Sequence, residues 1–360
     1  MKATQESSTN LSGEKADIMT AQRKNLDSAD VLKFILSILI VATHTSLLDG
    51  YITPVARLAV PAFFMISGYF FFGRINACNG KAEQKLYLKK SVRHNLLLYL
   101  FWFVVLIPLT LYVRGYHTMG VFSGLWHLLR DFCFGSTFQS SWYITALITG
   151  FTIVLFLSYR LPQSALVIIG VIFYIPSLLS SNYEFLISSS ETLTALSNSL
   201  SQVFLLPCRN FSVAILYIAI GKYLVEKSYE GKTKKYTITF LLAFAALIAE
   251  YLLLRHSGVK IEDSDCYIAL PFAAYYLCKV FLTLDISCKF SQTLRKISTV
   301  SYCAHMAVFM VVGKMFKIFG IPDWRNVFVF TLTLLLTWAV GMIIFKLEKI
   351  RIFRFLKYSH

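Results

Sequence analysis

The chain has 360 residues, of which 56% are hydrophobic and only 15% are charged, and its mean hydropathy is +0.61. Soluble domains carry roughly 25% charged residues, so this composition excludes an ordinary soluble protein and indicates a membrane protein. The net charge of +16 would suit a nucleic-acid partner, but its distribution along the chain favours membrane topology and no nucleic acid.

Residues 1–24 are polar and rich in Ser and Thr, so we expect a disordered cytoplasmic tail and no cleavable signal peptide. Apolar stretches of about 20 residues follow, the length at which a helix crosses a bilayer. They predict an all-α, polytopic bundle of about ten transmembrane helices, with a membrane domain over 25–346 and a basic cytoplasmic tail over 347–360. The predicted spans are 31–49, 52–72, 93–113, 141–159, 163–180, 203–225, 236–255, 266–285, 298–316 and 326–346.

The Lys and Arg residues between these spans predict the orientation. With the N-terminus inside, 24 of them fall in inside segments and 6 in outside segments. This asymmetry follows the positive-inside rule, so both termini are predicted to be cytoplasmic in a multi-pass protein of the inner (plasma) membrane. The short apolar stretch 121–135 lies in a predicted outer loop, where we expect an interfacial helix against membrane lipids.

The first predicted span carries Lys33 and His44, although ionisable groups are costly in hydrocarbon. The two residues are 11 positions apart, which on a helix places them about 20° apart in direction and ~16 Å apart along the axis. Together with Asp30 and Ser37 they form a polar stripe. A functional stripe is one interpretation. The other is that Lys33 extends to the interface while His44 bonds to a neighbouring helix.

Further ionisable residues lie in other predicted spans: Arg57, Arg209, Glu250 and His305. Several costly groups at similar depth favour a shared polar cavity, and the structural alternative is an ion pair between Glu250 and one of the arginines. The cationic segment 73–95 could bind a phosphate-bearing ligand, or could follow only the positive-inside rule and bind lipid headgroups.

The seven cysteines show no close spacing of the kind that binds metal, so no metal site is predicted. Cys133 and Cys266 both fall in predicted outer loops. The sequence leaves open whether these two form a disulfide or remain free thiols.

Several segments resemble a known family. They are NLDSADVLKFILSILIVATHT (25–45), VARLAVPAFFMISGYFFF (55–72), KKSVRHNLLLY (89–99), SWYITAL (141–147) and STVSYCAHM (298–306). The first pairs a basic residue with a His eleven positions later, and the second has an Arg followed by Val-Pro-x-Phe-Phe-x-x-Ser-Gly-Tyr. In these motifs the chain is similar to the acyltransferase-3 family of integral membrane acyltransferases. The last segment departs from the family, because Cys-Ala-His replaces its usual apolar-Tyr-apolar-x-His.

The resemblance implies an O-acetyltransferase type of enzyme with no bound cofactor. It would move an acyl group from cytoplasmic acyl-CoA, commonly acetyl-CoA, to a hydroxyl of a cell-surface polysaccharide or lipid-linked glycan. His44 would be the general base, and Arg57 would stabilise the oxyanion or hold the acceptor. The residues assigned to the donor are Lys33, Ser67, Lys90 and Arg93. The residues assigned to the acceptor cavity are Trp142, Tyr143, Arg209, Glu250 and His305.

Other interpretations stay open at this point. Ser301, near His305, is an alternative nucleophile, although it lacks the pattern of a nucleophile elbow. Some family members carry an appended periplasmic esterase-like domain, which we do not expect here. The main alternative function is a multi-pass transporter or flippase for a glycan precursor or small solute, and a third is a membrane sensor or scaffold with an inactive site.

Overall fold

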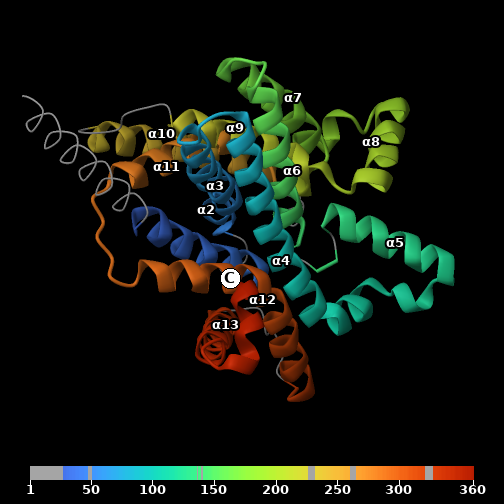
Figure 1. Cartoon of the computed structure of the whole chain (residues 1–360). Helices are drawn as coiled ribbons and strands as arrows, with labels where there is room; N and C mark the ends of the chain where they lie inside the picture. The colour runs from blue at the N-terminus through green and yellow to red at the C-terminus, as the bar shows by residue number, and fades with distance from the viewer. Residues whose placement is uncertain are drawn as a thin grey trace, which may run out of the picture.

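All the secondary structure that we describe is helical, and most of the helices pack into one bundle (Figure 1). The computed structural model describes residues 27–47, 51–135, 137–138, 141–225, 232–259, 265–320 and 327–360. None of these residues belongs to a β-strand, as expected in lipid, where helices satisfy their own backbone hydrogen bonds. The predicted tail over 1–24 lies outside the described residues. The all-α, polytopic fold is confirmed.

The first helix covers residues 27–44. The α-helices that follow it are α2 (Thr53–Ala56), α3 (Ala59–Asn76), α4 (Lys81–Arg114), α5 (Val121–Phe134), α6 (Ser141–Ser158), α7 (Gln163–Leu179), α8 (Glu191–Phe204), α9 (Phe211–Val225), α10 (Thr233–His256), α11 (Leu270–Thr283), α12 (Ser291–Ile318) and α13 (Val327–Leu347). Short 3₁₀ segments are η2 (Tyr116–Thr118), η3 (Glu184–Leu186), η4 (Pro207–Arg209) and η6 (Arg351–Ser359).

The described helices account for the predicted spans. Seven helical stretches within these residues are long and apolar enough to cross a membrane. Two shorter apolar helices, α7 and α11, coincide with the predicted fifth and eighth spans, and the helix over 27–44 coincides with the first. Each predicted span therefore contains a helix.

Two spans contain interruptions that the sequence analysis did not predict. The second is divided into α2 and α3 at Arg57 and Leu58. Pro61 follows at the position whose N–H would have paired with the carbonyl of Arg57, and proline has no N–H to donate. In the sixth span, η4 begins with Pro207, and the long helix α9 begins only at Phe211. Both interruptions place an arginine at the end of a helix.

Helix α9 is the centre of the bundle and packs against α3, α6 and α7. Its residues from Val213 to Ala219 are almost completely buried. Glycines allow its closest contact, the one with α3. A Cβ added to Gly221 would overlap the carbonyl oxygen of Met65, and one added to Gly68 would lie 3.0 Å from the carbonyl oxygen of Ile218. The backbones of the two helices therefore touch directly.

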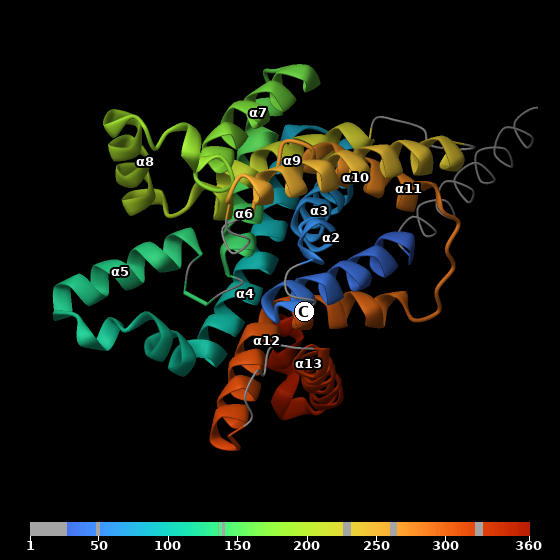
Figure 2. The same cartoon turned by 180° about the vertical axis from the view of Figure 1, so that it is seen from behind.

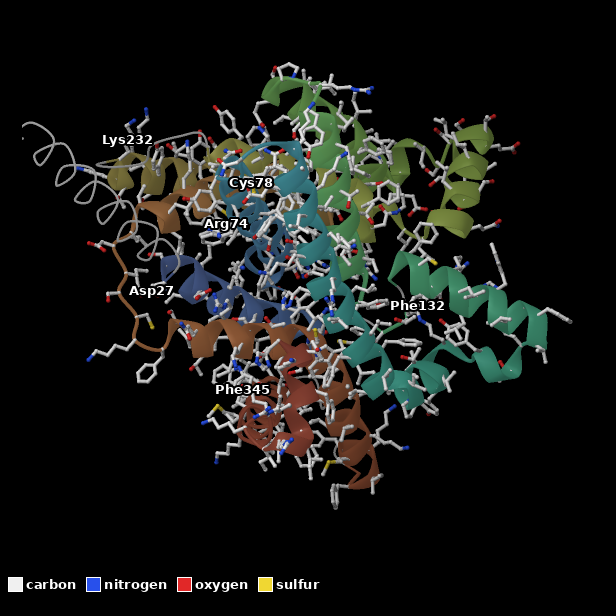
Figure 3. All side chains as sticks on the ribbon, viewed as in Figure 1. Asp27, Arg74, Cys78, Phe132, Lys232 and Phe345 are labelled. Carbon is white, nitrogen blue, oxygen red and sulfur yellow. The ribbon has the colours of Figure 1, made fainter. Side chains whose placement is uncertain are left out.

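Helices α5 and α8 project from the same side of the bundle in both views (Figures 1 and 2). Helix α5 confirms the helix predicted over 121–135, and it exposes Val121, Phe122 and Trp126. Phe132 of α5 lies on the opposite side of the bundle from Asp27 and Lys232 (Figure 3). The exposed apolar rings of α5 are typical of a helix that lies in a membrane interface.

The first helix and α12 run side by side in the same direction (Figure 2). Asp30 lies 3.8 Å from Arg295 near their starts, and the rings of His44 and His305 are 5.0 Å apart, more than two turns further along. The chain then returns through α13 to η6, where the indole N–H of Trp102 donates to the carbonyl oxygen of Ser359 at 3.0 Å. The end of the described chain is thereby held against α4.

Candidate active site

Two of the cavities in the described bundle are lined by predicted site residues, one around His44 and one around Lys33. The His44 pocket has a volume of about 100 Å³. It is lined by Ile40, Thr43, His44, Ala56, Arg57, Val60, Pro61, Trp142, Cys208, Arg209, Val213, Tyr217, Asp265, Cys266, Leu270 and Tyr302. The helix break at Arg57 and the start of α9 thus meet at this pocket.

The Lys33 cavity is larger, at about 690 Å³. It is lined by Asp30, Lys33, Phe63, Ser67, Phe70, Arg74, Tyr87, His94, Asn95, Leu98, Tyr143, Ile144, Leu147, Arg295, Lys296, Ser298, Thr299, Tyr302, Cys303 and His360. Four of these side chains are Lys or Arg and one is a carboxylate, so the cavity is cationic. Two of the cations are partly neutralised, Arg295 by Asp30 at 3.8 Å and Lys296 by Glu348 at 2.9 Å.

Three aromatic rings pack together where the two cavities meet at Tyr302: Phe63 of α3, Tyr143 of α6 and Tyr302 of α12. Their centroids are 6.1 Å apart for Phe63 and Tyr143, 6.3 Å for Phe63 and Tyr302, and 5.1 Å for Tyr143 and Tyr302. Tyr302 lines both cavities, whereas Phe63 and Tyr143 line only the Lys33 cavity. We call these three residues the ring layer. Tyr302 is the side chain of this layer that both cavities share.

The first helix connects the two cavities along one face. Lys33 opens into one and His44 into the other, as expected from their spacing of 11 residues. Ser37, between them, is fully buried and donates to the carbonyl oxygen of Phe34 at 2.7 Å. The polar stripe predicted from the sequence therefore ends in a cavity on each side of the ring layer.

His44 packs against a second histidine whose hydrogen position is fixed by its surroundings. The Nδ1 atom of His305 lies 2.8 Å from the carbonyl oxygen of Ser301 and 3.0 Å from that of Tyr302. Carbonyl oxygens only accept, so Nδ1 carries a hydrogen. The Nε2 atom of His305 is buried and has no hydrogen-bond partner among the described residues. A donor from the neighbouring imidazole of His44 would satisfy it.

On the other side of the pocket, one carboxylate joins two arginines. Asp265 forms an ion pair with Arg57 through Oδ1 and receives Nε and Nη2 of Arg209 on Oδ2 at 2.8 and 2.7 Å. Arg57 and Arg209 were expected to share a cavity, and they do. Their shared partner is Asp265 and not Glu250. Asp265 was missed because it lies between spans, although its segment EDSDC, residues 262–266, is acidic enough to have indicated a partner.

Comparison with known protein families assigns most of the chain to one of them. Residues 26–346 match the profile of the acyltransferase-3 family, which is described as an acyltransferase domain. The chain belongs to the acyltransferase-3 family. Membership implies transferase chemistry in a membrane protein, with an acyl donor and an acceptor. The residues of the ring layer and of both cavities, apart from His360, fall within the matched part of the chain.

Three curated relatives of this acyltransferase-3 protein are bacterial. Two are amino-acid racemases of Enterococcus faecalis, 27% identical over 69% of this chain and 35% of the relative, and 26% identical over 82% and 42%. The third is a serine/alanine racemase of Enterococcus gallinarum, 23% identical over 70% of this chain and 36% of the relative. The chain thus spans less than half the length of these relatives. No solved structure matches it.

In this acyltransferase-3 protein Glu250 does not line the His44 pocket. It bonds instead to the segment that follows Asp265 in the sequence. Its Oε1 accepts from the backbone N–H of Ile268 at 2.6 Å and from the hydroxyl of Tyr183 at 2.5 Å. Its Oε2 accepts from the N–H of Ala269 at 2.8 Å. Burial and the bond to this carboxylate raise the pKa of Tyr183, so the phenol remains a donor. Glu250 fixes the start of α11.

Residues in and just after α7 are joined by a second set of hydrogen bonds to the residues that precede α11. The hydroxyl of Ser181 accepts from the N–H of Asp265 at 2.9 Å, and the amide of Asn182 donates to the carbonyl oxygen of Cys266 at 2.6 Å. The hydroxyl of Tyr174 donates to the carbonyl oxygen of Tyr267 at 2.9 Å. Asp265 is therefore held in place by its own backbone as well as by the two arginines.

We expect Glu250→Ala to destabilise the fold by about 1–3 kcal/mol, because two backbone N–H groups and a phenol lose their acceptor. The thermal unfolding midpoint of the purified protein measures this loss. Glu184→Ala is the matched control, since Glu184 is an exposed side chain near Tyr183. Equal midpoints for the two variants would contradict the anchoring role of Glu250.

The remaining predicted residues are distributed between the cavities. Trp142 lines the His44 pocket, whereas its neighbour Tyr143 lines the Lys33 cavity, where its hydroxyl lies 3.3 Å from Oγ of Ser67. Lys90 and Arg93 are exposed and do not line either cavity, so their assignment to the donor stays a prediction. Arg74, Arg295 and Lys296 line the cationic cavity and were not assigned to the donor from the sequence.

The structure also bears on two alternatives from the sequence analysis, a serine nucleophile and a disulfide. Ser301, considered as a nucleophile, is buried, and its hydroxyl lines neither cavity. Cys133 is exposed and Cys266 is buried, and both are free thiols, so the disulfide considered between them is not formed. The described residues contain no group of three or more His, Cys, Asp or Glu side chains arranged to hold a metal.

Proposed function

We propose that the protein transfers an acyl group from acyl-CoA, bound at the Lys33 cavity, to a hydroxyl of a cell-surface polysaccharide or lipid-linked glycan at the His44 pocket. The observation that carries the proposal is the arrangement of the two cavities. A cationic cavity and a histidine pocket meet at the ring layer, with Tyr302 lining both. A thioester arm that enters from one side needs to pass only this layer to reach His44.

The donor end is supported by charge and size. CoA carries several phosphate charges, and Lys33, Arg74, Arg295 and Lys296 line the larger cavity. Cationic side chains bind phosphate through charge-assisted hydrogen bonds. In the proposed orientation this cavity faces the cytoplasm of the inner membrane, in agreement with the excess of Lys and Arg in the predicted inside segments.

The chemistry proposed for the His44 pocket is direct acyl transfer. A ring nitrogen of His44 takes the proton of the acceptor hydroxyl as the hydroxyl oxygen attacks the thioester carbonyl carbon. The guanidinium of Arg57 stabilises the negative charge on the carbonyl oxygen. The C–S bond then breaks, the new C–O ester bond remains on the acceptor, and the CoA thiolate leaves and takes up a proton. Acetyl-CoA is the donor that we propose to test first.

Lys33 should affect donor binding more than the chemical step. We expect Lys33→Ala to raise the KM for acetyl-CoA about tenfold, the effect of losing one charge-assisted contact, with a much smaller change in kcat. Initial rates of CoA release over a range of donor concentrations measure both constants. Lys89→Ala is the matched control, because Lys89 is exposed on α4 and lines neither cavity. An unchanged KM in Lys33→Ala would count against the donor site.

Thioester consumption tests the proposal as a whole. The wild-type protein in nanodiscs is given radiolabelled acetyl-CoA and a crude glycan-lipid extract, and CoA release and label transfer are followed. Release of CoA with label moving to a glycan is the expected result. A closed layer between two cavities would also suit a transporter that alternates between sides. Uptake of a solute or glycan precursor by vesicles, without CoA release from any acyl-CoA, would favour that function instead.

A further inference from the structure

Among the described residues that line the His44 pocket, positive charges outnumber negative ones. Arg57 and Arg209 contribute two guanidinium groups to the lining, and Asp265 contributes one carboxylate. We infer that the acceptor is anionic and carries a carboxylate or phosphate close to the hydroxyl that is acylated. This inference rests on the proposed function, because it names the class of acceptor for the same site.

The two arginines retain groups that a ligand can contact. The side chain of Arg209 is 41% exposed and that of Arg57 is 20% exposed, although both are paired with Asp265. The Nε–H group of Arg57 is buried and has no acceptor among the described residues. A buried donor without an acceptor is costly, and an anionic group on the ligand would satisfy it. The pocket is therefore incomplete without an acceptor of hydrogen bonds.

Asp265 acts as an internal carboxylate that orients both arginines. Its backbone is bonded to Ser181, and the chain that follows is bonded to Glu250, so the protein itself holds Asp265 at the pocket. Among the described lining residues, one carboxylate between two guanidinium groups leaves one positive charge in excess. Because guanidinium groups present several donors in a fixed plane, the arginines can bind Asp265 and a second oxyanion together.

The position of His44 determines where the reacting hydroxyl would lie. His44 and the Arg57–Asp265–Arg209 cluster line one pocket of about 100 Å³, a volume that accommodates only a small part of a ligand. An acceptor with its anionic group on the arginines would thus present a nearby hydroxyl to His44. A neutral acceptor could offer the Nε–H of Arg57 only an uncharged oxygen, which forms a weaker hydrogen bond than an oxyanion does.

A matched pair of probes tests the inference. Methyl glucuronide and methyl glucoside differ in having a carboxylate or a hydroxymethyl group on the same sugar ring. Their dissociation constants are obtained from ligand-dependent shifts of the unfolding midpoint of the full chain in phosphatidylcholine nanodiscs. We expect methyl glucuronide to bind about tenfold more tightly. Equal binding of the two probes would overturn the inference.

Two substitutions shift this preference in opposite directions. Arg209→Gln removes the surplus charge and should reduce the ratio of the two dissociation constants to near one. Asp265→Asn removes the competing carboxylate and should raise the ratio above that of the wild type. A merely structural role would lower the ratio in both variants and would also overturn the inference. Arg255→Gln is the control, since Arg255 is an exposed arginine outside the pocket and should leave the ratio unchanged.

The anionic group could belong to a glycan or to a lipid headgroup, and a second nanodisc composition distinguishes these sources. If added phosphatidylglycerol removes the preference for methyl glucuronide by competition, a headgroup occupies the arginines. If the preference persists, the source is a glycan. CoA release is measured in the same samples. Anion preference without any CoA release would contradict the proposed function while leaving the ligand class of the pocket supported.

Discussion

Replacing His44 with alanine is expected to lower acyl transfer by about 10²–10⁴-fold, the usual contribution of a general base. The imidazole of His44 lines the pocket that Arg57 also lines. Among the described aromatic contacts, its ring packs against one other ring, that of His305. His305 is buried with its Nδ1 bonded to backbone carbonyl oxygens, so it cannot easily turn to replace His44. Radiolabel transfer from acetyl-CoA at saturating donor measures the loss.

The matched control for this substitution is His256→Ala. His256 is an exposed residue at the end of α10 and lies outside both cavities, so its loss should leave the rate unchanged. Donor binding should be retained in His44→Ala, because His44 does not line the Lys33 cavity. Transfer at the wild-type rate in a folded His44→Ala protein would exclude His44 as the base.

Gly221→Ala should be a strongly destabilising substitution in the bundle. The added methyl group would overlap the carbonyl oxygen of Met65, which is backbone and cannot turn aside, and it would lie 3.0 Å from Cα of Gly68. Helices α3 and α9 would have to separate. Overpacking of this kind costs about 1–3 kcal/mol. The unfolding midpoint of the purified protein measures the cost, and we expect it to fall clearly.

Gly73→Ala provides the contrast on the same helix pair. Gly73 lies within α3, and a Cβ added there would meet no atom within 4 Å. In a helix interior, alanine in place of glycine is favourable by roughly 0.5–1 kcal/mol. The midpoint should therefore stay the same or rise. A fall of equal size in both variants would show that the contact between α3 and α9 is not what makes Gly221 sensitive.

The fold could be predicted from the sequence because lipid leaves few choices. A run of apolar residues long enough to cross the bilayer has to be helical, so each predicted span contains a helix. The relation between Lys33 and His44 was predictable for the same reason, since both lie on one regular helix whose periodicity is fixed. The breaks at Arg57 and before Phe211 were harder to predict, because proline in a membrane helix is often tolerated without an interruption.

The ion-pair partners of the charged residues could not be predicted from helix periodicity. Glu250 was the only acidic residue considered within a span, so it was the natural partner for Arg57 or Arg209. The structure instead pairs both arginines with Asp265, whose place depends on hydrogen bonds from other segments. The Lys33 cavity shows the same limit. Arg295 lines it although it lies far along the chain from Lys33, whereas Lys90, in a dense cationic segment, does not.

The ring layer has an electrical consequence. In the proposed orientation the two cavities open to opposite sides of the membrane, so most of the membrane voltage would fall across the thin barrier where they meet, at Tyr302 and the rings of Phe63 and Tyr143 that pack on it. Moving one elementary charge through such a barrier involves about 2.3 kcal/mol for each 100 mV. A thioester is uncharged, so in the proposed reaction the acyl group would cross the barrier without electrical work while the CoA phosphates remain among the cations around Lys33. Acyl delivery would then be independent of the membrane potential, and no ion would need to accompany it.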